Sequence, residues 1–288
     1  MIKTMLYPKL AFFIISNTMK IDQKKLILDK SYLQGYNKKH ILDLCKSYKL
    51  LISGTLIYEI LKDEKMRSSL FFKLPPGPKY SEYIPSISEL IKEEIEKCEE
   101  CGKPSEHIVK RNYSVLRRFR NPHVVLSQPE IAAIKLEKEF LSTLLIDGHL
   151  GFMGSIFKKY NKPEISKELT ELNNGKINDF SFMNNYLKAQ RNLGANIPRI
   201  KFFTENSITY RYYQAMLIFS FDTCNRYANF ETITNSERAV EKIRHDINDM
   251  SYMILSLLEG GFAVKEEKLK LWWNLLKKPD TPKIHLQT

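Results

Sequence analysis

The stretch Lys25-Leu26-Ile27-Leu28-Asp29-Lys30-Ser31-Tyr32-Leu33 predicts a strand whose short apolar run is closed by Asp29. Helical apolar spacing follows over residues 37–48, and Leu50-Leu51-Ile52 predicts a second buried strand. Ser53 and Gly54 then begin another predicted helix, over residues 55–63. This alternation of strands and helices predicts a parallel sheet with right-handed crossovers. Ligands of such sheets gather at the carboxyl ends of the strands, where Asp29 lies.

The middle of the chain has a different character. Leu74-Pro75-Pro76-Gly77-Pro78 breaks the pattern, and helices are expected after it over residues 88–100, 105–119, 129–160, 163–173 and 178–193. No internal repeat is present. We therefore interpret residues 74–199 as an all-helical insertion.

Sheet-like segments return near the end of the chain. A long helix is expected over residues 207–229, helices over 236–246, 250–258 and 267–276, and strands over 230–234, 262–264 and 284–286. The predicted fold is α/β: a parallel sheet flanked by helices, with a core of residues 19–73 and 200–288 and a large helical insertion. Residues 1–18 are expected to be an appendage, because Met19 directly precedes the core and could be the true start.

Several acidic side chains are predicted to meet at one edge of the sheet. Asp29 follows the first strand, Glu59 lies on the helix after the second, and Asp246 and Asp249 are three residues apart in a predicted helical region. Glu266 and Glu267 come shortly after Gly260-Gly261-Phe262-Ala263-Val264. Converging carboxylates repel one another unless a cation lies among them, and Mg²⁺ or Mn²⁺ suits an all-oxygen site. Such an ion polarises a phosphodiester and lowers the pKa of an attacking water.

The order of these residues resembles that of PIN-domain nucleases, a family of small α/β metal-dependent endoribonucleases that includes many toxins of toxin-antitoxin pairs. The resemblance lies in Leu26-Ile27-Leu28-Asp29-Lys30-Ser31, in residues 53–61 with Glu59, in Asp249 ahead of Met253-Ile254-Leu255, and in Phe262-Ala263-Val264-Lys265-Glu266-Glu267. It covers roughly residues 20–63 and 205–288 and leaves the middle of the chain outside.

The resemblance implies a PIN-like core in which Asp29, Glu59 and Asp249 hold Mg²⁺ or Mn²⁺, with Asp246 and Glu267 assisting and Ser31 supporting them. In the family, the fourth acid is Asp or Asn and follows a Thr or Ser by two residues. Here Lys265 stands for the hydroxyl residue and Glu267 for the acid, and Glu266 is an alternative. Without such a site, Asp29 and Asp249 would be helix caps and Glu59 would lie on a solvated helix face.

Charge points to a polyanionic partner or to a biased genome. The chain has 45 Lys and Arg against 33 Asp and Glu, a formal net charge of +12. Residues 103–120 concentrate this charge and interleave aromatic rings, so Arg111, Tyr113, Arg117, Arg118 and Arg120 are candidate nucleic-acid contacts. Alternatively, this run is a solvated helix that pairs by charge with the acidic residues 89–100. Tyr210-Arg211-Tyr212-Tyr213 is interpreted mainly as helix packing.

Four scattered cysteines do not form a disulfide framework, which predicts a reducing compartment and a cytoplasmic protein. Cys98, Cys101 and His107, with His123, are potential zinc ligands, but their spacing favours structural thiols at a helix end. The apolar run at residues 10–15 is too short to span a bilayer, so no membrane association is expected.

These observations predict a metal-dependent nuclease that favours RNA. The helical insertion suggests a specialised substrate or a regulatory protein partner, and a toxin or defence effector fits this architecture. The alternative is a non-catalytic nucleic-acid-binding or protein-interaction module on the same scaffold.

Overall fold

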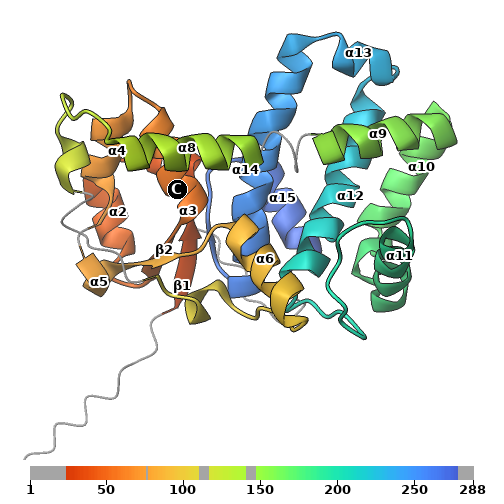
Figure 1. Ribbon diagram of the computed structural model, residues 1–288, viewed down its shortest axis with the longest axis horizontal. Coiled ribbons are helices and arrows are strands. Elements are labelled where there is room, and N and C mark those ends of the chain that lie inside the picture. The colour runs from red at the N-terminus through yellow and green to blue at the C-terminus, as the bar shows by residue number, and fades with distance from the viewer. Residues whose placement is uncertain (1–23, 76, 110–116, 141–146, 278–288) are drawn as a thin grey trace, which may run out of the picture.

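Four short parallel strands form the sheet of the computed structural model, which describes residues 24–75, 77–109, 117–140 and 147–277 (Figure 1). The strands are β1 (Lys25–Leu28), β2 (Lys49–Ser53), β3 (Ser81–Ile84) and β4 (Phe262–Ala263), in the order β3-β2-β1-β4. Leu26 pairs with Leu50, Ile52 with Tyr83, and Ile27 with Phe262. The predicted α/β class with a parallel sheet flanked by helices is confirmed.

Strand β1 lies at the centre of this sheet and of the core. Leu26, Ile27 and Leu28 are all completely buried, as expected for a parallel strand covered on both faces. The backbone N–H of Asp29 donates to the carbonyl of Ala263 at 3.2 Å. The carboxyl ends of β1 and β4 are thus fixed side by side.

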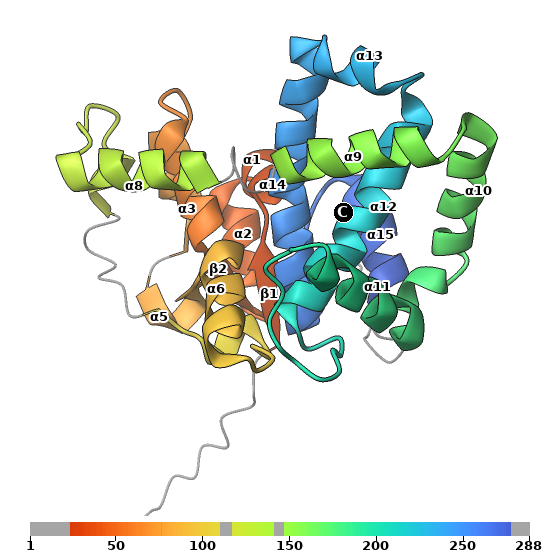
Figure 2. The ribbon, with the colours of Figure 1, turned by 45° about the vertical axis from the view of Figure 1, so that its right-hand side comes forward.

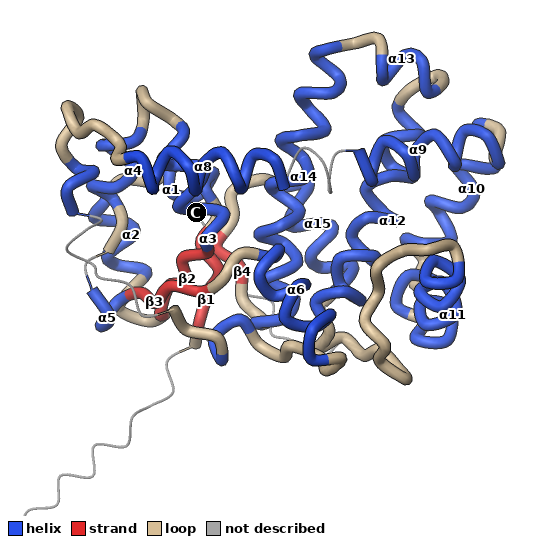
Figure 3. Tube along the Cα trace, viewed as in Figure 1, coloured by secondary structure: helices blue, strands red, loops and turns tan. Residues whose placement is uncertain are grey.

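Helices surround the strands and also build one end of the molecule by themselves (Figure 3). Beside the sheet lie α1 (Lys30–Gly35), α2 (Lys38–Leu44), α3 (Gly54–Lys62), α4 (Arg67–Lys73), α5 (Gly77–Tyr80), α6 (Ile87–Lys97) and α8 (Gln128–Phe140). The helical end contains α9 (Asp147–Lys159), α10 (Lys162–Asn173), α11 (Phe180–Asn192) and α12 (Ile208–Arg226). Helices α13 (Phe230–Thr234), α14 (Glu237–Glu259) and α15 (Glu267–Leu276) complete the described chain.

Helix α14 joins the two parts, because it packs against both β1 and α12. Its Met253, Ile254 and Leu255 are completely buried. Helix α12 in turn contacts α9, α10 and α11. None of the helices in the described ranges has both the length and the apolar character of a membrane span.

Most predicted helices are present within a few residues of their expected bounds, but several predicted elements are wrong. The first strand ends at Leu28 rather than at residue 33, because the Asp29 side chain caps α1. Residues 230–234 form helix α13, not a strand: the Asn229 side chain accepts a hydrogen bond from the backbone N–H of Thr232 and starts a helical turn. The helices expected over 236–246 and 250–258 are one continuous helix, α14.

The span 74–199 is not all-helical, because β3 lies within it and pairs with β2. Tyr83 and Ile84 are buried in the sheet, so this segment belongs to the α/β core. The helix expected over 105–119 is wrong at residues 105–109, whereas Arg117 is helical. Short 3₁₀ turns form at Pro104–Glu106 and Arg118–Arg120. The strand predicted over 284–286 lies outside the described residues.

Candidate acidic site

Asp29 is buried at the carboxyl end of β1, where it caps helix α1. Its Oδ2 accepts hydrogen bonds from the backbone N–H of Ser31, at 3.1 Å, and from the Ser31 hydroxyl. Its Oδ1 is buried and has no hydrogen-bond partner among the described residues. Burial raises the pKa of Asp29 to about 7, and the charges of Glu59 and Glu266 add to this against the hydrogen bond from Ser31.

Glu59 lies on α3 and is held by two side chains of α14. Asn248 Nδ2 donates to Glu59 Oε1 at 3.0 Å, and the Tyr252 hydroxyl donates to Oε2. All three side chains are buried. Glu59 therefore does not lie on a solvated helix face, and its carboxylate has a fixed place beside α14. Sequence reasoning did not identify Asn248 and Tyr252, although their spacing of four residues places both on one helical face.

Asp249 lies on α14 next to Asn248 and belongs to the same acidic group. Burial raises its pKa to about 9, and the charges of Glu266, Asp29, Glu59 and Asp246 raise it further, in that order. Glu266 directly precedes α15 and is exposed. Four carboxylates from four separate segments therefore share one local electrostatic field; we call Asp29, Glu59, Asp249 and Glu266 the acidic cluster.

Asp246 and Glu267, the two acids predicted to assist the metal ligands, have other partners in the structure. Asp246 is paired with cations, since its Oδ2 lies 3.7 Å from Arg226 Nη2 and 3.4 Å from Lys268 Nζ. The Glu267 side chain is 80% exposed and pairs with Lys270 at 2.7 Å. Glu266, rather than Glu267, interacts with Asp29 and Asp249. Of the two predicted candidates for the fourth acid, the structure thus brings Glu266 into the group and leaves Glu267 paired with Lys270, because residue 266 immediately precedes α15 and residue 267 begins it.

The donor set fits a hard divalent cation in its chemistry. All four side chains offer oxygen, the ligand that Mg²⁺ and Mn²⁺ prefer, and Asp29 keeps one buried oxygen without a partner. Burial is the largest cause of the raised pKa values of Asp29 and Asp249, and the neighbouring carboxylates raise them further. In the described residues as placed, no three Asp, Glu, His or Cys side chains are arranged to hold a metal ion. Binding would therefore need side chains of the cluster to move.

Two arginines of the basic run at residues 103–120 are engaged in contacts within the protein. Arg118 pairs with Glu130, and Arg120 donates to the carbonyls of Phe71 and Leu74 at 3.3 and 3.4 Å. Arg117 is exposed. The candidates Arg111 and Tyr113 lie outside the described residues. Arg118 and Arg120 hold residues 118–120 against their neighbours.

The aromatic-basic run of α12 packs as expected, since Tyr210 and Arg211 are buried. Arg211 Nη1 donates to Gln214 and to the carbonyl of Leu276. This run has a structural role.

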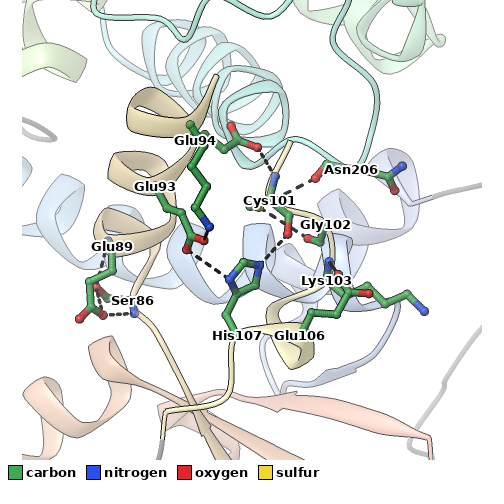
Figure 4. Close-up of polar contacts among 11 residues, drawn as sticks. Ser86, Glu89, Glu93, Glu94, Cys101, Gly102, Lys103, Glu106, His107 and Asn206 are labelled. Carbon is green, nitrogen blue, oxygen red and sulfur yellow. Dashed lines mark hydrogen bonds and ion pairs between the residues drawn. The ribbon is translucent and has the colours of Figure 1, made fainter. Parts of the chain in front are cut away.

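Cys101 and His107 lie side by side (Figure 4), but they and Cys98 are not arranged as a zinc site. His107 Nε2 contacts the carbonyl of Cys101 at 2.6 Å, and Nδ1 contacts Glu93 at 3.2 Å, so both ring nitrogens face protein acceptors. Burial and the charge of Glu94 raise the pKa of the Cys101 thiol, which opposes the thiolate that zinc requires. Cys98 ends α6 in a left-handed conformation, and His123 is exposed. The geometry agrees with structural thiols.

Comparison of the chain with protein-family models, with curated proteins and with solved structures found no match. The assignment of function therefore depends on the acidic cluster and on the residues that resemble the PIN family.

Proposed function

We propose that this protein is a metal-dependent nuclease that cleaves phosphodiester bonds, with RNA as the favoured substrate. One observation carries the proposal. Four carboxylates from β1's end, α3, α14 and the start of α15 share one field at the carboxyl edge of a parallel sheet. Ligand sites of parallel sheets lie at this edge.

The cost of this arrangement supports a functional role. Burying carboxylates near one another opposes folding unless protons or a cation compensate the charge. A core could use apolar side chains at the same positions without that cost. Functional sites are where such perturbed acids gather.

The residues of the cluster would have distinct roles. Asp29, Asp249 and Glu266 would hold Mg²⁺ or Mn²⁺, while Asn248 and Tyr252 keep Glu59 oriented beside them. Ser31 would fix Asp29 through the two hydrogen bonds to Oδ2, leaving Oδ1 for the ion. When bound, such an ion supplies charge neutralisation at the phosphate and a lower pKa for the attacking water. RNA preference and a toxin or defence role follow from the resemblance to PIN nucleases.

Metal binding tests the site without requiring the correct substrate. Millimolar Mn²⁺ should raise the melting temperature of the wild-type protein, because an ion that binds only the folded state stabilises it by mass action. Asp29→Asn should abolish this rise, since it removes the ligand charge while nearly keeping the shape. The measurement is a thermal melt with and without Mn²⁺ and chelator. Equal metal-induced shifts in wild type and variant would contradict the assignment of Asp29.

A non-catalytic nucleic-acid-binding module on the same scaffold is the second candidate. The hydrogen bonds of Glu59 favour this second candidate, because Asn248 and Tyr252 already donate to both oxygens of the carboxylate. In that case Mn²⁺ would not stabilise the protein, and nucleic acid would bind without being cut.

A further inference from the structure

A second polar feature lies far from the acidic cluster, along helix α11. A cleft of about 500 Å³ is formed by this helix and by the loop that joins it to α12. Figure 1 shows α11 at the opposite end of the molecule from α4 and α5, and Figure 2 shows the loop beside it. Helices α12 and α14 separate the cleft from α3, which carries Glu59 (Figure 1).

The cleft is lined by cations and by no carboxylate. Lys188, Arg191, Arg199 and Lys201 all contribute to its wall. Lys188, Arg199 and Lys201 are exposed, and none of them forms an ion pair with a described residue. Lys176, by contrast, pairs with Glu168 and Glu171. Cations gathered in a concave wall without acids attract anionic ligands.

The wall of the cleft is held in place by its own hydrogen bonds. Asn184 Nδ2 donates to the carbonyls of Phe180 and Phe203, both at 2.9 Å, and its Oδ1 accepts from the N–H of Phe203 at 2.7 Å. Arg191 donates to the carbonyl of Pro198, and its guanidinium lies 5.9 Å from the centre of the Phe203 ring. These contacts fix the loop on α11, so the cleft is already formed without a ligand.

Aromatic surface adjoins the cations. Phe202 lines the cleft and is 53% exposed, and Phe180, at 40% exposed, lies beside it with 6.2 Å between ring centres. Burying these rings would be favourable, yet they remain in solvent. Exposed rings next to unpaired cations suit a ligand that carries both phosphates and flat bases.

We propose that this cleft binds a segment of single-stranded nucleic acid, with phosphates at Lys188, Arg199 and Lys201 and a base stacked on Phe202. The choice of ligand rests on the proposed nuclease function. Because the cleft is remote from the acidic cluster, it holds the nucleic acid and takes no part in cutting it.

Binding of single-stranded RNA tests the proposal separately from catalysis. The measurement uses the full chain with Asp249→Asn, in chelator. The triple variant Lys188→Ala, Arg199→Ala, Lys201→Ala should weaken binding of a short labelled single-stranded RNA roughly tenfold or more. It should also reduce the slope of log affinity against log salt by about 2, at about 0.7 for each lost phosphate contact. Phe202→Ala should weaken binding by roughly fivefold or more through lost stacking.

The matched control removes two lysines and one arginine elsewhere: Lys158→Ala, Arg238→Ala, Lys242→Ala. All three side chains are exposed and lie on α9 and α14. The control should leave affinity nearly unchanged, whereas equal losses in control and cleft variants would overturn the proposal. Equal binding of duplex RNA with no effect of Phe202→Ala would also overturn it, as would equal competition by poly-glutamate or by a mononucleotide. Loss of binding in the cleft variant together with no cleavage by wild type would leave the cleft assigned and the nuclease proposal refuted.

Discussion

At the residue scale, the neighbours Glu266 and Glu267 have different surroundings. Glu266 raises the pKa of both Asp29 and Asp249, whereas Glu267 pairs with Lys270 and is 80% exposed. Glu266→Gln should therefore lower metal-dependent cleavage by roughly tenfold or more, as expected for loss of a charged ligand of the ion. Glu267→Gln is the matched control and should cleave as the wild type does. A cleavage assay in which Glu267→Gln is the more damaging change would refute this assignment.

The raised pKa values of the cluster also predict how stability depends on pH. Asp29 and Asp249 have pKa values of about 7 and 9, above their ordinary value of 3.8. Between pH 3.8 and the raised pKa of each group, the folded state binds more protons than the unfolded state. In this range the two groups therefore lower the free energy of unfolding as pH rises. Asp249→Asn removes one of them. In chelator at about pH 8, it should raise the free energy of unfolding by about 1 kcal/mol or more.

Urea denaturation of wild type and Asp249→Asn from about pH 5 to about pH 9 measures this effect. The gain should shrink toward about pH 5, because the pH there approaches the ordinary carboxyl pKa of 3.8 and protonating Asp249 on folding then costs little. It should also shrink at saturating Mn²⁺, because the ion compensates the charge. A variant less stable than wild type at about pH 8 in chelator would show that Asp249 is not under repulsion.

The sequence identified Asp29, Glu59 and Asp249 because each stands at a recognisable place relative to a strand or helix. It did not identify Asn248 and Tyr252, whose role exists only because α3 and α14 meet in the fold. It also gave Glu267 preference over Glu266. One residue of offset at a helix start decides which carboxylate faces the cluster, and spacing alone does not fix that offset.

At the element scale, Glu94 of α6 binds the start of α12. Glu94 is completely buried and accepts hydrogen bonds from the backbone N–H groups of Cys101, Ile208 and Thr209 at 2.8 to 3.0 Å. Figure 4 shows the bond from Cys101. It also accepts from the Ser207 hydroxyl at 2.9 Å. A carboxylate at this place compensates the positive end of a helix and satisfies N–H groups that have no partner within it.

Glu94→Gln should lower the free energy of unfolding by about 2 kcal/mol, because the amide NH₂ would face buried N–H donors that lose their acceptor. The matched control is Glu96→Gln on the same helix, whose side chain is 62% exposed and lies 3.7 Å from Lys92. That change should cost less than about 0.5 kcal/mol. Chemical denaturation measures both, and similar losses in the two variants would argue against this role of Glu94.

Elements with strong periodicity were predictable, whereas those defined by pairing or continuity were not. Strand β3 has only four residues and follows a proline-rich break, so its place in the sheet depends on pairing with β2. Residues 230–234 contain β-branched side chains, yet the Asn229 cap makes them helical. Helix α14 runs unbroken through Asn248 and Asp249, because these polar residues face α3 and the cluster rather than ending the helix.

At the scale of the whole molecule, the α/β part carries the acidic cluster, and the helical end carries the cationic cleft. Both features occur in one chain with a net charge of +12, and α14 packs against both parts. This division suits a nuclease that binds single-stranded nucleic acid at one place and cuts it at another. The parallel sheet was predictable from the alternation of elements near residues 25–63, but the placement of the cleft was not, since it depends on how the α11–α12 loop folds back.

The most direct test of the central claim is cleavage of labelled single-stranded RNA by the purified full chain, with Mn²⁺ or with chelator. Wild type should cut only with metal, and Asp249→Asn should reduce the rate by roughly a thousandfold or more while melting cooperatively, as loss of a group central to catalysis does. Cutting that persists in chelator, or at the wild-type rate in a folded Asp249→Asn, would contradict the account. Strand binding without any cutting would instead identify the protein as a binding module.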